Sequence, residues 1–249
     1  MGLKELFDYR NYHVDYRLDD IMELEGIAKD FDLIVLDRDG TTGGYHASQP
    51  DGRFVKILEK IKGKSEMVSN SSYDTMIKIN EIYGDLMPVA KLVRVGIFAS
   101  IDDDEPDDEC DILFRFVDKS LRAYEVLDNR LMDCTDEFCT KNVPRGFSLG
   151  YFGTKHQYKK PDPRVLEAVV DLAKQEERIP KDNPRVLMVG DKYCMDVACG
   201  NRAGFKTAKV KTQGQLSDLK EGRVDYILGR VLFDTPFGWM MSKIAEMRR

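Results

Sequence analysis

The sequence predicts an α/β protein in which a parallel sheet carries helices on both faces and is interrupted by an inserted α+β module. Two observations lead to this prediction. Short apolar runs alternate along the chain with segments whose apolar residues recur every three or four positions, which is typical of a parallel sheet. Between residues 86 and 146, strand-like runs follow one another without such helices, which indicates a module of a different kind.

The first part of the chain alternates between the two patterns. The run Leu33–Leu36 contains no polar residue, so we expect a strand buried on both faces. Residues 40–52 are rich in Gly, Thr, Ser and Pro and are expected to form a loop. The expected helices are 18–30, 54–61 and 73–84, and the expected strands are 32–37 and 66–70.

The same alternation resumes after residue 146. The run Val186–Val189 is again wholly apolar, and Pro161 and Pro163 indicate a turn before a helix. The expected strands are 147–152, 186–189, 206–210 and 226–228, and the expected helices are 163–176, one that begins near 195, and 236–248.

The long interval between residues 70 and 160 predicts the inserted module. One helix and one strand would need roughly half of that interval. We therefore predict a core formed by 1–85 and 147–249 and a cap-like module at 86–146. The strands expected in the module are 90–99, 112–117 and 122–127.

The boundary of the module has an alternative. Residues 92–99 could themselves form the third core strand, with the module beginning at 101. The acidic run 102–109 lacks the residue spacing of a calcium-binding loop, and blocks of like charge are usually solvated. We therefore expect this run to face solvent.

Composition restricts the class of protein. The 249-residue chain has a formal net charge of −6, which argues against a general nucleic-acid or anionic-membrane binder. No apolar run approaches the roughly 20 residues that cross a bilayer, so no stable membrane insertion is expected. The start lacks a signal-peptide core, and five cysteines favour free thiols in a reducing compartment. We therefore expect a cytoplasmic protein, and its oligomeric state stays open.

Polar side chains follow the apolar runs where the strands are expected to end. They are Asp37, Asp39, Ser69, Asn70 and Asp191. The carboxyl ends of parallel strands meet at one edge of a sheet, and Lys160 can reach that edge from its turn. Carboxylate oxygens are ligands that Mg²⁺ prefers, and a cation would relieve the repulsion between Asp37 and Asp39. Hydroxyl and ammonium donors would bind phosphoryl oxygens.

Each feature has a simpler interpretation when it is taken alone. Gly40 would suit any turn, Ser69 could cap the next helix, and Asp191 could be a cap as well. Lys159 and Lys160 could both be solvated, and we prefer Lys160 because a proline follows it. The order of the features on successive strand ends favours a joint phosphoryl-transfer site.

The four motifs resemble those of phosphatases of the haloacid dehalogenase (HAD) superfamily, in the same order. They are Asp37-Arg38-Asp39-Gly40-Thr41, Val68-Ser69-Asn70, Lys160-Pro161, and Gly190-Asp191 with Asp196. The stretch Gly190–Gly204 is similar to subclass III, which includes YqeG-like and phosphatidylglycerophosphate phosphatases. The first motif also resembles histidinol-phosphate and heptose-bisphosphate phosphatases, although their Cys/His zinc loop is not recognisable here. The resemblance implies a Rossmann-like HAD fold.

The resemblance also implies a reaction: hydrolysis of a small phosphate monoester with Mg²⁺ and an aspartyl-phosphate intermediate. Asp37 would be the nucleophile, and Asp39 the general acid and base. The implied metal ligands are Asp37, the backbone carbonyl of Asp39, and Asp191, supported by Asp196; the implied phosphate-binding residues are Ser69, Asn70 and Lys160. Two alternatives stay open. One is a phosphotransferase or phosphomutase of the same superfamily, and the other is a non-catalytic relative that binds phosphate or a partner.

Overall fold

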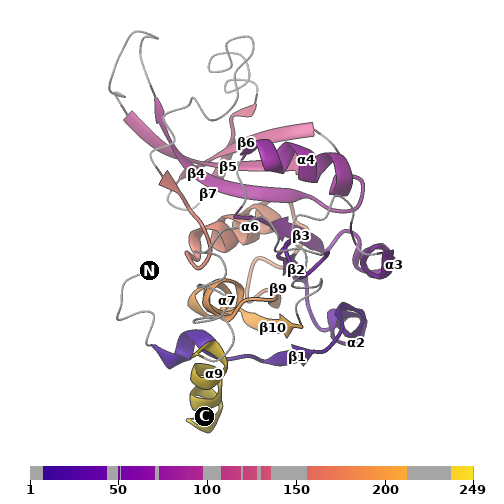
Figure 1. Cartoon of the computed structure of the whole chain (residues 1–249). Helices are drawn as coiled ribbons and strands as arrows, with labels where there is room; N and C mark the ends of the chain where they lie inside the picture. Colours follow the sequence, from indigo (N-terminus) through magenta and orange to yellow (C-terminus); the bar gives the residue numbers. More distant parts are fainter. Residues whose placement is uncertain are drawn as a thin grey trace, which may run out of the picture.

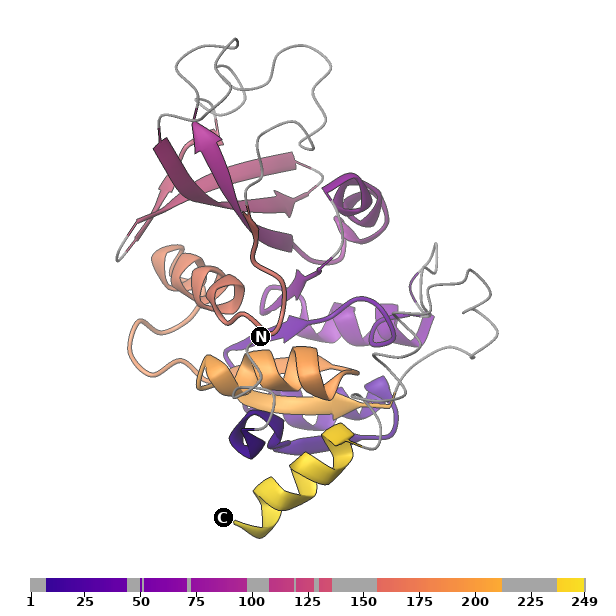
Figure 2. The same ribbon diagram turned by 60° about the vertical axis from the view of Figure 1, so that its left-hand side comes forward.

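The protein is described from a computed structural model, which covers residues 8–43, 50, 52–70, 73–97, 108–118, 120–127, 130–135, 156–211 and 237–248. Within these residues ten strands form one mixed sheet, and helices lie on both of its faces (Figure 1 and Figure 2). This arrangement confirms the predicted α/β class with a Rossmann-like core.

The sheet has a parallel half and an antiparallel half. Its strands are β1 (Tyr16–Leu18), β2 (Leu33–Leu36), β3 (Ser65–Val68), β4 (Val89–Ile97), β5 (Asp108–Val117), β6 (Ser120–Leu127), β7 (Arg130–Asp133), β8 (His156–Gln157), β9 (Val186–Gly190) and β10 (Lys206–Val210). The order is β1-β10-β9-β2-β3-β4-β5-β6-β7, with β8 paired to β4. Neighbours from β1 to β4 run parallel, and those from β4 to β7 run antiparallel.

The helices divide between the two faces of the sheet. They are α2 (Leu24–Ala28), α3 (Gly52–Ile61), α4 (Tyr73–Tyr83), α6 (Arg164–Gln175), α7 (Ala198–Arg202) and α9 (Gly238–Met247), with short helical turns η1 (Tyr9–Tyr12), η2 (Ile21–Glu23) and η3 (Tyr193–Val197). Ile34 and Leu36 of β2 pack with α2, α3 and α4, while Leu33 and Val35 pack with α6. Alternate strand residues point to opposite faces, so the apolar run Leu33–Leu36 is buried on both faces of the sheet, as the sequence predicted.

Two local differences from the sequence prediction concern the N-terminal part. Leu18, the first residue of the expected helix, instead ends β1, which pairs with β10. The expected helix over 18–30 is reduced to η2 and α2, because Asp20 forms a capping box with Glu23 and so starts the helical turn there. The expected strands at 147–152 and 226–228 lie outside the described residues, as does the acidic run except for its last two residues, which begin β5.

Strand β4 joins the two halves of the sheet. Val89 and Ala90 pair in parallel with β3, and the strand then continues to Ile97, antiparallel to β5 along its whole length. The described strands of 86–146 are therefore hydrogen-bonded into the core sheet. The division into a core of 1–85 and 147–249 and a module of 86–146 stays a prediction.

A buried ion-pair cluster connects the antiparallel half to the core. Arg115 of β5 donates to both carboxylate oxygens of Glu66 in β3, at 2.8 and 3.2 Å, and to Glu176 at the end of α6, at 2.9 Å. Arg178 donates to the same two glutamates, at 3.0 and 2.7 Å. The side chain of Glu66 has no solvent exposure. The buried carboxylate of Glu66 thus contacts two guanidinium groups, which compensates for its desolvation, while Glu176 lies at the exposed side of the cluster.

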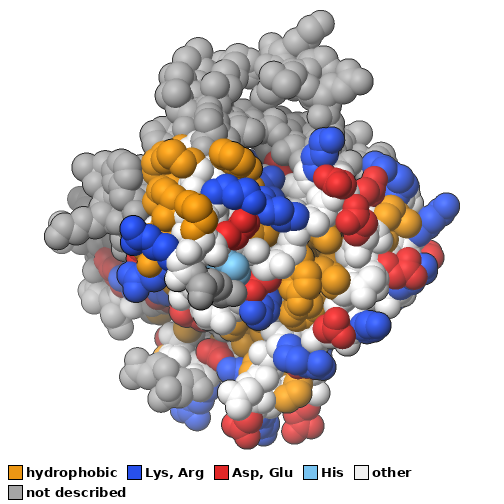
Figure 3. Space-filling view, turned by 90° about the horizontal axis from the view of Figure 1, so that it is seen from below, with side chains coloured by type: hydrophobic (Ala, Val, Ile, Leu, Met, Phe, Trp, Pro, Cys, Tyr) orange, Lys and Arg blue, Asp and Glu red, His pale blue; other side chains and the backbone are white. Residues whose placement is uncertain are grey.

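The described surface carries charges of both signs. The end of the molecule that holds α9, viewed in Figure 3, shows basic and acidic side chains next to one another with apolar side chains between them. That face is not the continuous basic surface that typifies a nucleic-acid interface. Among the residues that the structure describes, no helix is both long enough and apolar enough to cross a bilayer.

Candidate active site

Asp37 lies at the carboxyl end of β2, held against the neighbouring strand. Its backbone N–H donates to the carbonyl of Val189 in β9 at 2.9 Å, so the residue continues the pairing of the two strands. The residue is only 6% exposed. The Oδ2 atom of Asp37 is buried and has no hydrogen-bond partner among the described residues. An oxygen of this kind, on a carboxylate at the edge of the sheet, is open to a ligand.

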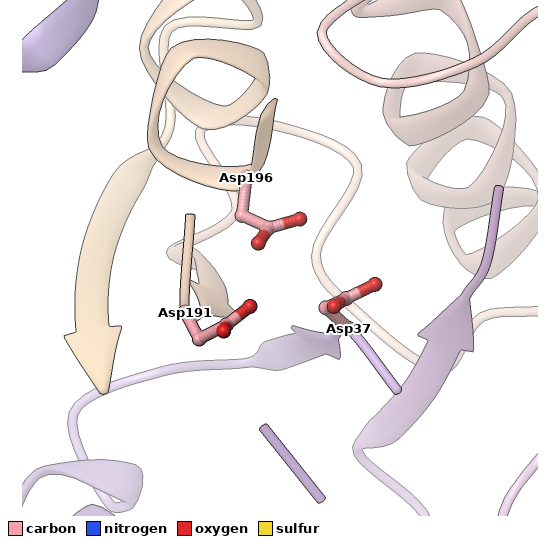
Figure 4. Close-up of side chains that lie close together, drawn as sticks. All are labelled: Asp37, Asp191 and Asp196. Carbon is pink, nitrogen blue, oxygen red and sulfur yellow. The ribbon is translucent and has the colours of Figure 1, made fainter. Parts of the chain in front are cut away.

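Asp37, Asp191 and Asp196 form a buried cluster of carboxylates. One oxygen from each lies within 4.8 Å of the others. Asp37 follows β2, Asp191 follows β9, and Asp196 comes from η3, as Figure 4 shows. Three buried carboxylates are costly unless cations compensate for them, and carboxylate oxygens are hard donors. The residues present therefore fit a hard divalent cation such as Mg²⁺.

Lys160 supplies one compensating charge. Its ammonium group donates to Asp37 Oδ1 and lies 2.7 Å from Asp196 Oδ1. Burial by itself would lower the pKa of Lys160, but the carboxylates of Asp196 and Asp37 outweigh it and raise the pKa. The lysine is therefore charged at neutral pH. Lys160 is 3% exposed, whereas Lys159 is exposed, so Lys160 is the lysine that contacts the cluster.

Asn70 fixes the backbone that carries Lys160. Its Oδ1 accepts from the Lys160 N–H at 2.8 Å, and its Nδ2 donates to the Lys160 carbonyl at 3.2 Å. This paired bond joins the loop after β3 to the turn before α6. Ser69, just before it, is buried at the end of β3. Asn70 thus acts on the cluster through Lys160 in this structure.

The surroundings of Asp196 disfavour the ionised form of its carboxyl group. Burial and the carboxylate of Asp37 raise its pKa while Lys160 opposes them, and the net result is a pKa of about 7. Oδ2 of Asp196 accepts from the backbone N–H of Lys192 at 3.1 Å. A cation placed among these carboxylates would favour the ionised form.

Asp39 stands beside the cluster rather than inside it. Its side chain is 21% exposed, and its Oδ1 lies 3.2 Å from Nη1 of Arg38. The chain turns sharply here: Gly40 has a φ of +80°, a value that L side chains rarely adopt, and Thr42 donates from its hydroxyl to the Arg38 carbonyl at 3.1 Å. The turn holds Asp39 next to Asp37 with access to solvent.

Comparison with known proteins finds a similarity to HAD-like hydrolases. A family model described as HAD-hydrolase-like matches residues 157–231, a segment that includes Lys160, Asp191 and Asp196. In this segment the chain is similar to HAD-like hydrolases. It is similar to the D-glycero-D-manno-heptose-1,7-bisphosphate 7-phosphatase of Chlorobaculum tepidum, with 37% identity over 89 residues. That match covers 29% of this chain and 43% of the relative, so it spans less than half of the relative's length. No solved structure matches the chain significantly.

The structure brings most of the predicted site residues together. Lys160 lies against Asp37, and Asp191 and Asp196 complete the carboxylate cluster. Asn70 reaches the site through Lys160. The side chain of Asp39 is outside the cluster. That the backbone carbonyl of Asp39 binds the metal stays a prediction.

Two residues near the site were not singled out from the sequence. Arg38 is 7% exposed and pairs with Asp39, and Nζ of Lys192 lies 4.0 Å from Asp191 Oδ1. The sequence contains one indication of them: each is a basic residue directly beside an acid that was predicted to belong to the site. Both add positive charge around the carboxylates of the site.

Gly190 allows the close approach of Asp196 to the strand end. A Cβ atom at residue 190 would overlap the Cβ and carboxyl atoms of Asp196. We therefore expect Gly190→Ala to displace Asp196 and to lower the free energy of unfolding by about 1–3 kcal/mol. Thermal unfolding would measure this. Gly26→Ala is the matched control, because nothing lies within 4 Å of a Cβ there and alanine favours the helix. Equal stability of the two variants would contradict the packing argument.

Proposed function

We propose that the protein is a Mg²⁺-dependent phosphatase that hydrolyses a small phosphate monoester through an aspartyl-phosphate intermediate. The observation that carries this proposal is the state of Asp37. One of its carboxylate oxygens is bound by Lys160, and the other is buried without a hydrogen-bond partner among the described residues. A fixed carboxylate with one open oxygen at a strand end is well placed for in-line attack on phosphorus.

The proposed first step uses Asp37 and Asp39. The open Asp37 oxygen forms a bond to phosphorus while the bond from phosphorus to the ester oxygen breaks. Protonated Asp39 gives its proton to that leaving oxygen, and the alcohol departs. Asp39 suits this role because it lies two residues from the nucleophile, is partly exposed and is outside the carboxylate cluster.

The proposed second step regenerates the enzyme. Ionised Asp39 takes a proton from a water molecule, whose oxygen attacks phosphorus and breaks the bond to Asp37, releasing inorganic phosphate. Ser69 and Lys160 would bind the phosphoryl oxygens. Asp37, Asp191 and the Asp39 carbonyl, supported by Asp196, would hold Mg²⁺, which supplies positive charge where the transferring group becomes more negative.

The relative suggests where to look for the substrate. Its name describes removal of the 7-phosphate from a heptose bisphosphate, so sugar phosphates are the first class to test. Selection by residues 86–146 and a cytoplasmic location are part of this proposal. The four cysteines that the structure describes, Cys110, Cys134, Cys194 and Cys199, form no disulfide with one another, which agrees with a reducing compartment.

The direct test is hydrolysis of para-nitrophenyl phosphate and a sugar-phosphate panel, with and without Mg²⁺, in ¹⁸O-labelled water. We expect Mg²⁺-dependent release of phosphate that carries one ¹⁸O atom from water. Transfer of the phosphoryl group to an added sugar, without ¹⁸O in the product, would indicate a phosphotransferase. No turnover on any ester, with phosphate still bound, would indicate a binding protein.

The metal assignment makes a separate prediction. Asp191→Asn removes one charge from the cluster, so the Mg²⁺ concentration for half-maximal rate should rise by at least about tenfold. Asp171→Asn is the control, since Asp171 is an exposed acid on α6. Titrating the rate with Mg²⁺ measures both. An unchanged Mg²⁺ dependence in Asp191→Asn would overturn the role of this residue.

A further inference from the structure

The segment that carries two of the clustered carboxylates is supported from outside the site. Residues 191–197 hold Asp191 at one end and Asp196 near the other, with Tyr193 between them. Tyr193 is only 6% exposed and is packed with Tyr12, Val14, Val197 and Met241. The buried ring of Tyr193 therefore anchors residues 191–197, which we call the metal-site segment.

Arg17 holds the hydroxyl of that ring. Its Nη1 donates to the Tyr193 hydroxyl at 2.6 Å, and its Nη2 donates to Ser242 Oγ at 2.8 Å and to Glu246 Oε1 at 2.7 Å. Arg17 belongs to β1, the edge strand, while Ser242 and Glu246 belong to α9. One guanidinium group thus ties together the edge of the sheet, the metal-site segment and the C-terminal helix.

Helix α9 also packs directly against Tyr193. A Cβ at Gly238 would lie 2.6 Å from Cβ of Tyr193, so the start of the helix is in close contact with the ring. On another side, Nζ of Lys209 lies 5.1 Å from the centre of the ring. In Figure 1, α9 lies beside the N-terminal helical turn at one end of the sheet. The helix is far from Asp37 in sequence, and it contacts the metal-site segment at Tyr193 and packs through Met241 in the same cluster as Val197.

The end of the same segment is anchored by a second set of bonds. Nδ2 of Asn201 donates to the carbonyl of Val197 at 2.9 Å and to that of His13 at 2.8 Å. The segment is therefore held at its middle and at its end by residues near the N-terminus. Such support matters here because Asp37, Asp191 and Asp196 repel one another, which would otherwise move the segment outward.

We propose that Tyr193 is a positioning residue for the metal site, and that Arg17 and α9 act on metal affinity through it. This inference rests on the proposed function. Outer residues that orient metal ligands commonly change metal affinity about tenfold or more when they are removed. Tyr193 does not contact substrate in this proposal, so its loss should weaken metal binding more than the chemical step.

The experiment titrates the metal-free full-length protein with Mn²⁺ and follows binding by electron paramagnetic resonance. Tyr193→Phe removes only the hydroxyl, and we expect the dissociation constant for Mn²⁺ to rise about tenfold. The turnover number at saturating Mg²⁺ should stay within about twofold, because the ligands themselves remain. Tyr16→Phe is the matched control: it alters the residue beside Arg17 on β1, whose ring packs against Phe31.

A double-mutant cycle tests the route from Arg17. If Arg17 acts through the Tyr193 hydroxyl, Arg17→Met with Tyr193→Phe should bind Mn²⁺ no more weakly than the worse single variant. This inference alone would be overturned by three results together: the wild-type protein binds Mn²⁺, Asp191→Asn weakens that binding, and Tyr193→Phe leaves it unchanged. Absence of Mn²⁺ binding by the wild-type protein would instead overturn the proposed function.

Discussion

Asp37→Asn should abolish turnover of phosphate esters while the fold remains. The amide has nearly the volume of the carboxylate but is a poor nucleophile, so we expect the turnover number to fall by at least about 10³-fold. Stability should be unchanged or higher, because the substitution removes one of three mutually repelling carboxylates. Turnover at saturating Mg²⁺ and thermal unfolding measure the two effects.

The control for this variant lies at the opposite end of the same strand. Asp32→Asn changes an acid that pairs with the exposed Arg185 just before β2 begins. It should leave turnover unaffected. Substantial Mg²⁺-dependent activity in Asp37→Asn, with the protein shown by mass spectrometry to retain the asparagine, would reject Asp37 as the nucleophile.

The second large effect concerns stability. Arg115→Met should lower the free energy of unfolding by about 3 kcal/mol or more, because it leaves the fully buried Glu66 with Arg178 as its remaining ion-pair partner among the described residues. The loss comes from a buried carboxylate that keeps only one of its two guanidinium partners. Denaturant unfolding of the full chain would measure it.

Arg185→Met provides the comparison. Arg185 also pairs with a carboxylate, Asp32, but its side chain is 61% exposed, so the loss should be within about 1 kcal/mol. A similar small loss in Arg115→Met would mean that the cluster does not join the antiparallel half to the core energetically. A larger loss would show that β5 contributes to the stability of β3.

The sequence predicted those parts of the site that depend on single strands. An apolar run followed by an acid places Asp37 and Asp191 at one edge, because parallel strands end together. The choice between Lys159 and Lys160 rested only on the proline that follows Lys160. The two lysines differ in burial, and the sequence does not show burial because it depends on how the turn packs against the cluster. The roles of these residues in catalysis stay predictions.

Features that depend on distant partners were harder to predict. Strand β1 is three residues long, and Leu18 fits a helical stripe as well as a strand; pairing with Val210 decides between them. Arg17 has no local signal at all, because its partners lie in η3 and α9. The strands of 86–146 were found approximately, but their sharing of β4 with the core was left open because apolar periodicity does not specify a pairing partner.

The shared strand β4 limits how the antiparallel half can move. A lid joined by flexible linkers swings about them, but β4 has no such linker between its pairing with β3 and its pairing with β5. Displacing β5 as a rigid body would break main-chain hydrogen bonds or twist the common sheet. Substrate entry by a wide hinge motion at this strand would therefore require partial unfolding, so adaptation to new substrates is expected to proceed through side chains and loops on a stationary frame.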